Sequence, residues 1–421
     1  MRYNKVAGII AFVFLFLISS KIQAQYTSSP YSMFGIGEVE SRTYGINSGM
    51  AGTGIGLESH NFMNTSNPAA LYIDTLTFIF DISSAAKISH YSYGSKKDNA
   101  TSMNLKKFAI GFRLFPKWAV SIGLRPYSNV GYKLRTTSPV EGTGHTYETD
   151  FEGSGGLSRL YWTNSFRITD NLSVGANASL LLGTIDRTET QLGMTPGTEG
   201  EFSIENSSSI QKGYFDFGAQ YTISPNPTTR YTLGVIYGYK TDIKFKNMVK
   251  VSSISTGNLL EESTTKSLTT SIPQYVGAGA SIISNRGSSS ITIAADYIYE
   301  NWGAIKNPST SVRYTNSHKF SIGTQYLPNF RLPRNYFQRI IYQAGASYNL
   351  SSLLINGEQA KEYAISMGLN LPLKLSRTIS YIHISADFGY RTGKSIMSEK
   401  YVMFTVGCSI NEIWFFKRFY D

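Results

Sequence analysis

The chain has 421 residues, of which 16% are charged, 14% aromatic and 41% hydrophobic, and its formal net charge is +11. A soluble domain usually carries about 25% charged residues, and a helical membrane protein needs apolar segments of about 20 residues, so the composition fits neither class. It fits a barrel that is apolar outside and polar inside. The Lys and Arg residues are spread singly along the chain, which argues against a nucleic-acid-binding protein.

Residues 1–24 have the features of an export signal. Arg2 and Lys5 precede an apolar run from Val6 to Ile18, and small residues lead up to Ala24. A charged start, an apolar core of about a dozen residues and a small residue before the cut are typical of a cleavable signal peptide. We therefore expect export and cleavage after Ala24, with the cell outer membrane as the destination.

Residues 25–74 differ from the rest of the chain, because they are rich in Gly, Ser, Thr and Asn and show no strand pattern. A stretch of this composition folds compactly only against another surface. A barrel of about fourteen strands has a lumen too wide for its wall side chains to fill. We expect this region to be an N-terminal plug, or hatch, inside the barrel. Its glycines are Gly35, Gly37, Gly45, Gly49, Gly52, Gly54 and Gly56.

Residues 75–421 are expected to form the transmembrane, antiparallel, all-β barrel. Apolar residues recur at every second position, as in Ile291–Tyr299 and Tyr231–Tyr239. Successive strand side chains point to opposite faces, so each segment has one apolar and one polar face. An open sheet in hydrocarbon would leave its edge amides unpaired, so the sheet must close. About fourteen strands are expected, an even number as in bacterial barrels, at 75–92, 101–114, 117–133, 155–168, 171–188, 201–224, 230–247, 262–284, 288–303, 315–327, 339–352, 360–372, 379–392 and 398–411.

The connections between these segments are alternately short and long. Short periplasmic turns and long extracellular loops are typical of such barrels, which places both termini in the periplasm. One periplasmic connection, 328–338, is longer than its position predicts and contains Pro328, Pro333 and several Arg residues. The short turns are at 115–117, 169–171 and 284–287, and the long connections are at 134–154, 189–200 and 248–261.

Two stretches before the first strand resemble the hatch of the FadL family of outer-membrane transporters. They are Gly49–Gly56 and Ser66–Leu71, and the second contains the sequence Asn67, Pro68, Ala69 that is a signature of the family's hatch. The resemblance implies a barrel that admits small hydrophobic compounds from outside and releases them sideways into the membrane, beside a kinked third strand, without a cofactor or a chemical step. Outer-membrane lipids and lipopolysaccharide would surround it.

Two further stretches, Ser29–Gly37 and Asn411–Arg418, look like the members of this family found in Bacteroidota. The third expected strand, 117–133, contains Gly123, Pro126 and Gly131. Proline has no N–H to donate, so inside a sheet it is confined to bulges and unpaired edges. Two interpretations remain open for Pro126: a lateral opening in the wall, or a simple bulge where the wall bends.

No catalytic, cofactor or metal site is predicted. The five histidines lack metal-ligand spacing, and Gly52–Gly56 lacks the strand and helix that a dinucleotide site requires. His383, Ser385 and Asp387 share one strand face, as in a barrel-wall hydrolase. Residues two apart on a strand lie about 7 Å apart, too far for direct hydrogen bonds, so lumen lining is the favoured interpretation and an enzyme the minor one.

Two functions from different classes follow. The first is a channel for passive uptake of small hydrophobic compounds. The second is a non-transporting barrel subunit of an outer-membrane protein assembly or secretion complex, which predicts an exposed apolar patch on loops or at the periplasmic end. The terminal Trp414–Tyr420 is one such candidate, and its simpler interpretation is an interfacial aromatic girdle or an assembly signal.

Overall fold

The computed structural model describes ten ranges of the chain, and every structural statement below concerns these residues. The expected signal peptide and Trp414–Tyr420 lie outside them. The described ranges are 29–58, 62–71, 73, 77–139, 145–192, 201–265, 269–305, 312–375, 378–393 and 396–413.

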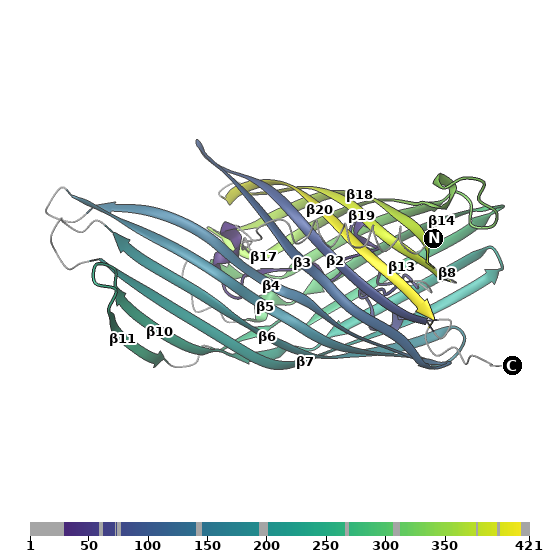
Figure 1. Cartoon of the computed structure of the whole chain (residues 1–421), viewed down its shortest axis with the longest axis horizontal. Coiled ribbons are helices and arrows are strands. Elements are labelled where there is room, and N and C mark those ends of the chain that lie inside the picture. The colour runs from purple at the N-terminus through teal and green to yellow at the C-terminus, as the bar shows by residue number, and fades with distance from the viewer. Residues whose placement is uncertain are drawn as a thin grey trace, which may run out of the picture.

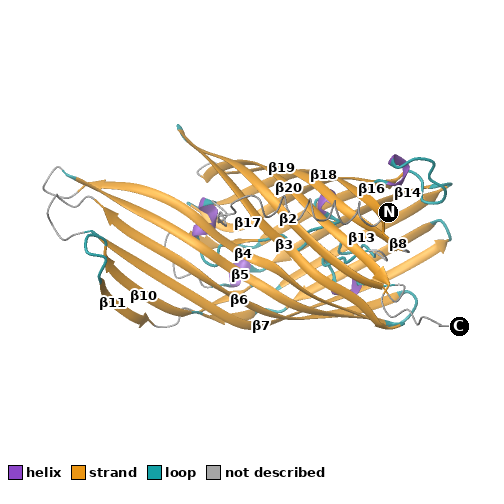
Figure 2. Ribbon diagram, viewed as in Figure 1, coloured by secondary structure: helices purple, strands orange, loops and turns teal. Residues whose placement is uncertain are grey.

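Fourteen long antiparallel strands form a closed barrel in the described part of the chain (Figures 1 and 2). Each pairs with its neighbour in chain order, and β20 pairs with β2 from Ile413–Thr77 to Ser398–Ser92, which closes the wall. The strands are β2 (Thr77–Tyr93), β3 (Lys96–Phe115), β4 (Trp118–Pro139), β5 (Thr146–Arg167), β6 (Leu172–Leu192), β7 (Phe202–Asn226), β8 (Thr229–Gly238), β13 (Tyr275–Arg286), β14 (Ser289–Glu300), β16 (Ser317–Leu327), β17 (Ile341–Ile355), β18 (Glu358–Leu375), β19 (Thr378–Gly393) and β20 (Ile396–Ile413).

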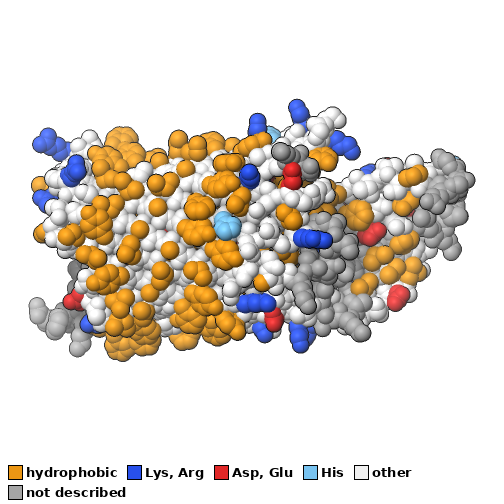
Figure 3. Space-filling view, turned by 180° about the vertical axis from the view of Figure 1, so that it is seen from behind, with side chains coloured by type: hydrophobic (Ala, Val, Ile, Leu, Met, Phe, Trp, Pro, Cys, Tyr) orange, Lys and Arg blue, Asp and Glu red, His pale blue; other side chains and the backbone are white. Residues whose placement is uncertain are grey.

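The alternation of apolar and polar residues has the expected structural meaning. The apolar face of each strand points outward: Leu233 is 56% exposed and Ile365 is 58% exposed. On the face that Figure 3 shows, hydrophobic side chains cover a broad band of the barrel, and Lys and Arg lie mainly beyond the edges of this band. A belt of this kind is suited to the hydrocarbon of a membrane. None of the helices among the described residues is long and apolar enough to cross a membrane.

Two expected strands, 230–247 and 262–284, are wrong as continuous wall strands. The wall strand β8 ends at Gly238 and β13 begins only at Tyr275. The residues between them form one long hairpin, whose base leaves the wall sheet and whose outer part rejoins this sheet beside β7. A period-two pattern cannot distinguish a strand in the wall from one that leaves it, because both alternate. The additional strands are β9 (Thr241–Lys244) paired with β12 (Thr269–Ile272), and β10 (Lys246–Ser253) paired with β7 and β11 (Leu259–Thr265).

The long connections expected at 134–154 and 248–261 are also largely strand. As a result β4 to β7, with β10 and β11, extend well beyond the other strands at one end of the barrel, on the left of Figure 1. This is the end opposite the one at which β20 ends at Ile413. The wall is therefore tall on one side only.

The residues before β2 contact the inner side of the wall. They contain only short elements: the 3-10 turns η1 (Pro30–Met33), η2 (Ser48–Met50) and η3 (Pro68–Ala70), and the two-residue strand β1 (Glu38–Val39). In Figure 2 these turns lie within the outline of the barrel. The remaining short elements are η4 (Trp302–Ala304), β15 (Val312–Tyr314) and η5 (Phe337–Arg339).

Candidate functional site

A ring of inward-facing glycines receives part of the N-terminal region. Three pairs lie directly opposite each other on neighbouring strands: Gly175 with Gly218, Gly234 with Gly279, and Gly323 with Gly345. We call these residues and Gly368 the glycine ring. We call residues 44–58 and 62–71, which contact it, the ring segment.

The contact between the two is too close for any other residue type. A Cβ on Gly234 would lie 2.0 Å from the carbonyl oxygen of Ile55, and a Cβ on Gly345 would lie 2.5 Å from the carbonyl carbon of Met50. These neighbours are backbone atoms, so they cannot move aside as a flexible side chain would. Glycine is the residue that lets two backbones approach in this way. The ring segment therefore lies directly on the wall.

Asn67 makes hydrogen bonds both to the wall and to other residues of the ring segment. Its side-chain oxygen accepts a hydrogen bond from the Ala69 N–H at 3.0 Å, which caps the turn η3. Its Nδ2 donates to the carbonyl oxygens of Ile55, Ala219 and Val235 at 2.9, 3.2 and 3.3 Å. Two of these carbonyls belong to β7 and β8. Pro68 and Ala69 are buried beside it, against β6 and β7.

A second anchor is Asp296 of β14. Its Oδ2 accepts hydrogen bonds from the backbone N–H groups of Gly54 at 2.7 Å and Ile55 at 3.0 Å. Backbone donors buried away from water need such partners. The ring segment thus gains from the wall the hydrogen bonds that its irregular backbone does not make internally.

The wall itself is interrupted between β3 and β4. The two strands pair from Phe115–Trp118 only as far as Phe108–Leu124, although both continue well beyond these residues. The interruption coincides with a bulge on each strand: β3 has an extra residue at Lys106, and β4 has one at Tyr127. A bulge bends its strand and increases its twist. Two bulges at the same level turn the strands apart.

The first residues of the N-terminal region take the place of β3 along this part of β4. Glu38 and Val39 of β1 pair with Asn129 and Ser128. The Ser29 N–H donates to the carbonyl oxygen of Gly131 at 2.7 Å. We call residues 29–42 the gap segment. It supplies hydrogen bonds to an edge of β4 that β3 has left.

Glu40 connects both sides of the interruption. Its Oε1 accepts a hydrogen bond from Lys106 Nζ of β3 at 2.7 Å and another from the side-chain amide of Asn129 of β4, and its backbone N–H donates to the carbonyl oxygen of Tyr127 at 2.9 Å. Burial raises the pKa of the Glu40 carboxyl, but Lys106 and the Tyr44 hydroxyl outweigh burial and hold this pKa below its ordinary value. Glu40 is therefore a carboxylate at neutral pH.

Other charges of the gap segment are also paired with the wall. Glu38 Oε1 lies 2.5 Å from the Arg391 guanidinium of β19, and Arg42 lies 2.9 Å from Glu300 Oε1 of β14. Arg42 also stacks on the ring of Tyr275, at 3.3 Å from its centroid. The gap segment is therefore held by ion pairs on several sides of the lumen.

The residues singled out on the third expected strand all lie on β4, at this interruption. Gly123 is still opposite Ala109 of β3. Pro126 lies two residues beyond Leu124, the last β3 partner, next to the bulge, and the Gly131 carbonyl accepts a hydrogen bond from the gap segment. A bulge at Pro126 is therefore present. Whether a path opens there is a matter of function.

A cavity of about 300 Å³ lies between the gap segment and the wall. This cavity has both charged and apolar lining side chains, and Asn67, Pro68 and Ala69 are not among them. Its charged lining consists of Glu38, Glu40, Arg42, Lys87, Lys106, Asp296, Glu300, Lys319, Glu362, Asp387 and Arg391.

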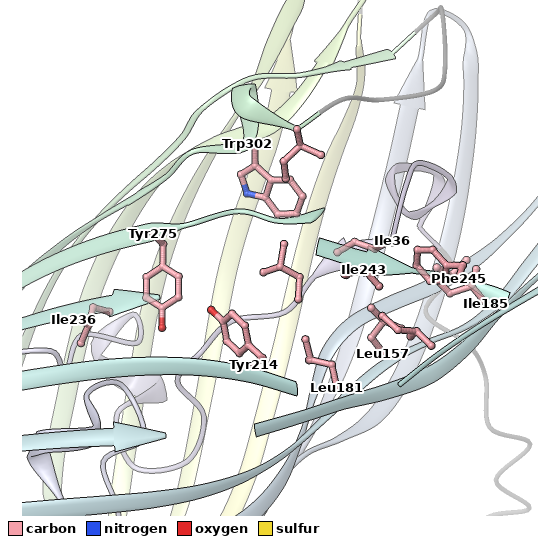
Figure 4. Close-up of a cluster of buried hydrophobic side chains, with 14 of the residues drawn as sticks. Ile36, Leu157, Leu181, Ile185, Tyr214, Ile236, Ile243, Phe245, Tyr275 and Trp302 are labelled. Atoms are coloured by element: carbon pink, nitrogen blue, oxygen red, sulfur yellow. The ribbon is translucent and has the colours of Figure 1, made fainter. Parts of the chain in front are cut away.

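Apolar side chains gather instead in a packed cluster toward the tall side of the wall (Figure 4). Leu157, Leu181 and Ile185 of β5 and β6 face Ile243 of β9 and Phe245, the residue between β9 and β10. Ile36 of the gap segment and Trp302 also belong to the cluster. It is the largest of the four buried apolar clusters in the described part of the chain.

The three residues of the hydrolase hypothesis do not form a hydrogen-bonded triad. His383 Nδ1 lies 2.9 Å from Asn370 Oδ1, and its Nε2 lies 2.7 Å from the Ser409 hydroxyl. Asp387 accepts instead from the Ser366 hydroxyl. His383, Ser385 and Asp387 are therefore buried lumen-facing residues of β19. Among the described residues, no group of three or more His, Cys, Asp or Glu side chains is placed to hold a metal ion.

Sequence reasoning identified Asn67 and Pro126 but missed the glycine ring, Glu40 and Lys106. The ring glycines could have been noticed, because each is a single glycine inside an otherwise regular strand pattern. A single glycine in a strand is a weak indication that another backbone approaches closely. Their alignment around the barrel becomes visible only when the strand register is known. Nothing in the sequence pairs Glu40 with Lys106.

Several solved structures share this architecture. The toluene transporter TodX of Pseudomonas putida is 17% identical, with a TM-score of 0.58 over 89% of this chain and 99% of that one. The Ralstonia pickettii toluene transporter TbuX is 14% identical, with a TM-score of 0.55 over 87% and 98%. A FadL homologue of Pseudomonas aeruginosa is 13% identical, with a TM-score of 0.53 over 88% and 99%.

At this identity the likeness shows a common fold, the closed antiparallel barrel of FadL-type channels. No curated protein sequence matches the chain. The family model described as BamG matches residues 6–421, which is nearly the whole chain, and so the protein belongs to the BamG family.

Proposed function

We propose that this barrel lets small hydrophobic compounds cross the outer membrane by diffusion and releases them sideways between β3 and β4. The observation that supports this most directly is the loss of β3–β4 pairing beyond Phe108 and Leu124. Strand edges left unpaired in hydrocarbon cost several kcal/mol for each amide. Here the gap segment covers the β4 edge, and a segment that is not part of the wall is able to leave it.

The two sides of the gap differ in how firmly they hold this segment. Backbone hydrogen bonds join it to β4, whereas the Lys106–Glu40 ion pair joins it to β3. We infer that the opening forms on the β3 side, between Lys106 and Glu40. Pro126 and Gly131 remain with the gap segment on the β4 side, and Gly123 marks the lower limit of the opening.

The N-terminal region has a supporting role in this proposal. We infer that residues 25–74 are a hatch, that residues 75–421 are the barrel, and that Asn67, Pro68 and Ala69 fix the hatch to the wall. We also infer that a signal peptide is removed after Ala24, and the mass of the mature protein would test this. We further infer that the chain is a Bacteroidota-type member. Outer-membrane lipids and lipopolysaccharide would surround it. No cofactor takes part.

The choice of compound follows from the packed apolar cluster and from the relatives. TodX and TbuX are toluene transporters, and CymD is a monoaromatic hydrocarbon channel. Monoaromatic hydrocarbons are accordingly the first compounds to test. They would bind among Leu157, Leu181 and Phe245 after the β9–β12 hairpin moves.

A reversible cross-link across the gap tests this function. Lys106→Cys and Asn129→Cys replace two side chains that meet at one oxygen of Glu40, and a short cleavable bis-maleimide would join them. Uptake of labelled toluene by cells is expected to stop when the link forms and to return when it is cleaved. The matched control is Lys133→Cys with Glu152→Cys, which are already opposite each other on β4 and β5. Unchanged uptake after complete cross-linking at the gap would refute lateral release.

A second function is favoured by the charged cavity. A hydrophobic compound would have to pass side chains such as Glu38, Lys87 and Arg391, which is costly because they would lose water. A non-transporting subunit of an outer-membrane protein assembly or secretion complex has no such difficulty. Gentle purification from native membranes distinguishes the two functions: a stoichiometric complex together with absent toluene uptake supports the subunit, and an isolated barrel with uptake supports the channel.

A further inference from the structure

The periplasmic connection between β16 and β17, residues 328–340, presents large hydrophobic side chains to water. Leu332 is 82% exposed and Phe337 is 69% exposed, the two largest fractions for large hydrophobic side chains among the described residues. Phe330 and Tyr336 are exposed beside them. The equivalent turn between β3 and β4 contains only Pro116 and Lys117. Contiguous exposed apolar side chains on a soluble surface usually mark a binding site.

This connection is held in one conformation by hydrogen bonds. The Asn329 N–H donates to the carbonyl oxygen of Gln338 at 3.0 Å, and Asn329 Oδ1 accepts from the Leu332 N–H at 3.0 Å. The Phe330 N–H donates to the carbonyl oxygen of Ser288 in the neighbouring turn at 2.9 Å. The apolar side chains are therefore presented by an ordered backbone, which lowers the entropy lost on binding.

The membrane interface does not account for these side chains. Tyr326 and Tyr342 lie opposite each other where β16 and β17 reach the periplasmic end, with Tyr326 on the outward face. Tyrosines in this position sit at the lipid–water boundary with the hydroxyl toward water. The Tyr342 hydroxyl donates to the carbonyl oxygen of Phe337 at 3.2 Å. Because this hydroxyl is the end of Tyr342 that faces water, residues 328–340 lie on the water side of the Tyr342 ring.

The charge around the apolar side chains has one sign. Residues 328–340 contain Arg331, Arg334 and Arg339 and no Asp or Glu, and all three arginines are exposed. The adjacent turn adds the exposed Arg286. None of the four has a carboxylate within ion-pair distance in the described part of the chain. A complementary surface is acidic, and guanidinium groups are suited to binding carboxylates through two parallel hydrogen bonds.

We propose that residues 328–340 are a docking surface for a periplasmic protein that presents acidic groups around an apolar pocket. Leu332 and Phe337 enter the pocket, and Arg331 and Arg334 pair with the surrounding carboxylates. This surface lies at the opposite side of the barrel wall from the β3–β4 gap in strand order, so the proposal goes beyond transport and holds whether or not the barrel conducts.

Site-specific photo-cross-linking in intact cells tests the proposal. The photoreactive residue p-benzoylphenylalanine replaces Phe337, and in a control it replaces Leu260, which is 62% exposed on β11 at the other end of the barrel. We expect a single adduct of defined mass from position 337 and no adduct of that mass from position 260. With Arg331→Glu and Arg334→Glu also present, the adduct should fall about 10-fold, because like charges at an interface oppose association. Arg331→Lys with Arg334→Lys should keep most of it.

A lipid surface is the alternative occupant, and a spin label distinguishes it. In a Cys408→Ala background, Leu332→Cys and Tyr326→Cys would each carry the label in vesicles that contain phosphatidylglycerol. We expect the label at 332 to collide mainly with a water-soluble nickel chelate and the label at 326 mainly with oxygen. A label at 332 that behaves like the one at 326 overturns the proposal, as does an adduct at 337 that is absent or insensitive to charge reversal. Toluene uptake in the same variants reports separately on transport.

Discussion

The gap segment and the ring segment follow each other in the chain and contact the same inner wall, but they are held by different interactions. The ring segment lies on backbone, where glycines let it approach and neutral amides such as Asn67 bind it. The gap segment is held by backbone hydrogen bonds to β4 alone and, on the other sides of the lumen, by ion pairs of Glu38, Glu40 and Arg42. Close packing tolerates no displacement, whereas an ion pair in a water-accessible cavity can separate and re-form. The comparison indicates that the ring segment is fixed and that the gap segment is able to move.

The largest expected effect comes from filling the glycine ring. Gly234→Val places side-chain atoms where the Ile55 carbonyl lies, and because both sides are backbone the ring segment must leave the wall. Overpacking of this kind costs about 3 kcal/mol or more. We expect protease cleavage within residues 44–58 while the barrel still migrates as folded on a cold gel. Gly213→Val is the control, because no atom lies within 4 Å of its Cβ position. Equal resistance of both variants would contradict the close contact.

Removing Glu40 should release the gap segment and leave the ring segment in place. Glu40→Ala leaves Lys106 without its carboxylate and Asn129 without its acceptor. Losing these hydrogen bonds to a charged group costs about 2–3 kcal/mol, which corresponds to about 30- to 160-fold faster exchange of the residue 40 amide hydrogen. Mass-spectrometric hydrogen exchange would measure this. Glu261→Ala on the exposed strand β11 should change nothing, and protection that survives at residue 40 would show that the backbone bonds to β4 are sufficient.

Substitutions at Asn67 show which of its hydrogen bonds is more important for holding the ring segment on the wall. Asn67→Ala loses the cap of η3 and the three donated hydrogen bonds, at about 1–2 kcal/mol. Asn67→Asp keeps the cap but places a carboxylate against the carbonyl oxygens of Ala219 and Val235. We expect Asp to destabilise the ring segment more than Ala. The urea concentration that exposes residues 62–71 to protease is the measurement, and the reverse order would mean that the cap is the more important contact.

Acidification is expected to have the smallest effect and to act on the gap segment. The Lys106 partner holds the pKa of Glu40 below its ordinary value although burial opposes this, so the carboxylate stabilises the segment above the ordinary carboxyl pKa of about 4.3. This contribution is lost as the pH falls through the lowered pKa. Hydrogen exchange at residue 40 should therefore rise at the acid end, while residues 66–71 should not respond. Glu40→Gln should remove the pH dependence.

The wall of the barrel could be predicted from the sequence because its cause is local. Alternation at period two decides which face of a strand meets lipid, and each strand carries this pattern independently of its partners. The same pattern is misleading between Gly238 and Tyr275, where β9 and β12 leave the wall sheet and β10 rejoins it beside β7, because all of these segments alternate alike. The charged lining of the cavity beside the gap segment could not be predicted from the sequence, because side chains from many strands contribute to it.

The site could be predicted only in part. Asn67 and Pro126 are visible because a short motif and a proline in a strand are unusual in themselves. The contact of Gly234 with Ile55, and that of Glu40 with Lys106, join residues far apart in the chain. They depend on register and on two bulges, which a single sequence does not reveal.

The pairing of β2 with β20 has a consequence for biogenesis. The seam runs from Thr77–Ile413 to Ser92–Ser398, so the first and last wall strands of the chain form it together. The wall cannot become a cylinder until its final strand has arrived, and the residues before β2 must already lie on the concave side when that happens. Until then the nascent sheet has two free edges that invite aggregation. Whatever receives this chain at the membrane must shield both edges for nearly the whole length of its delivery.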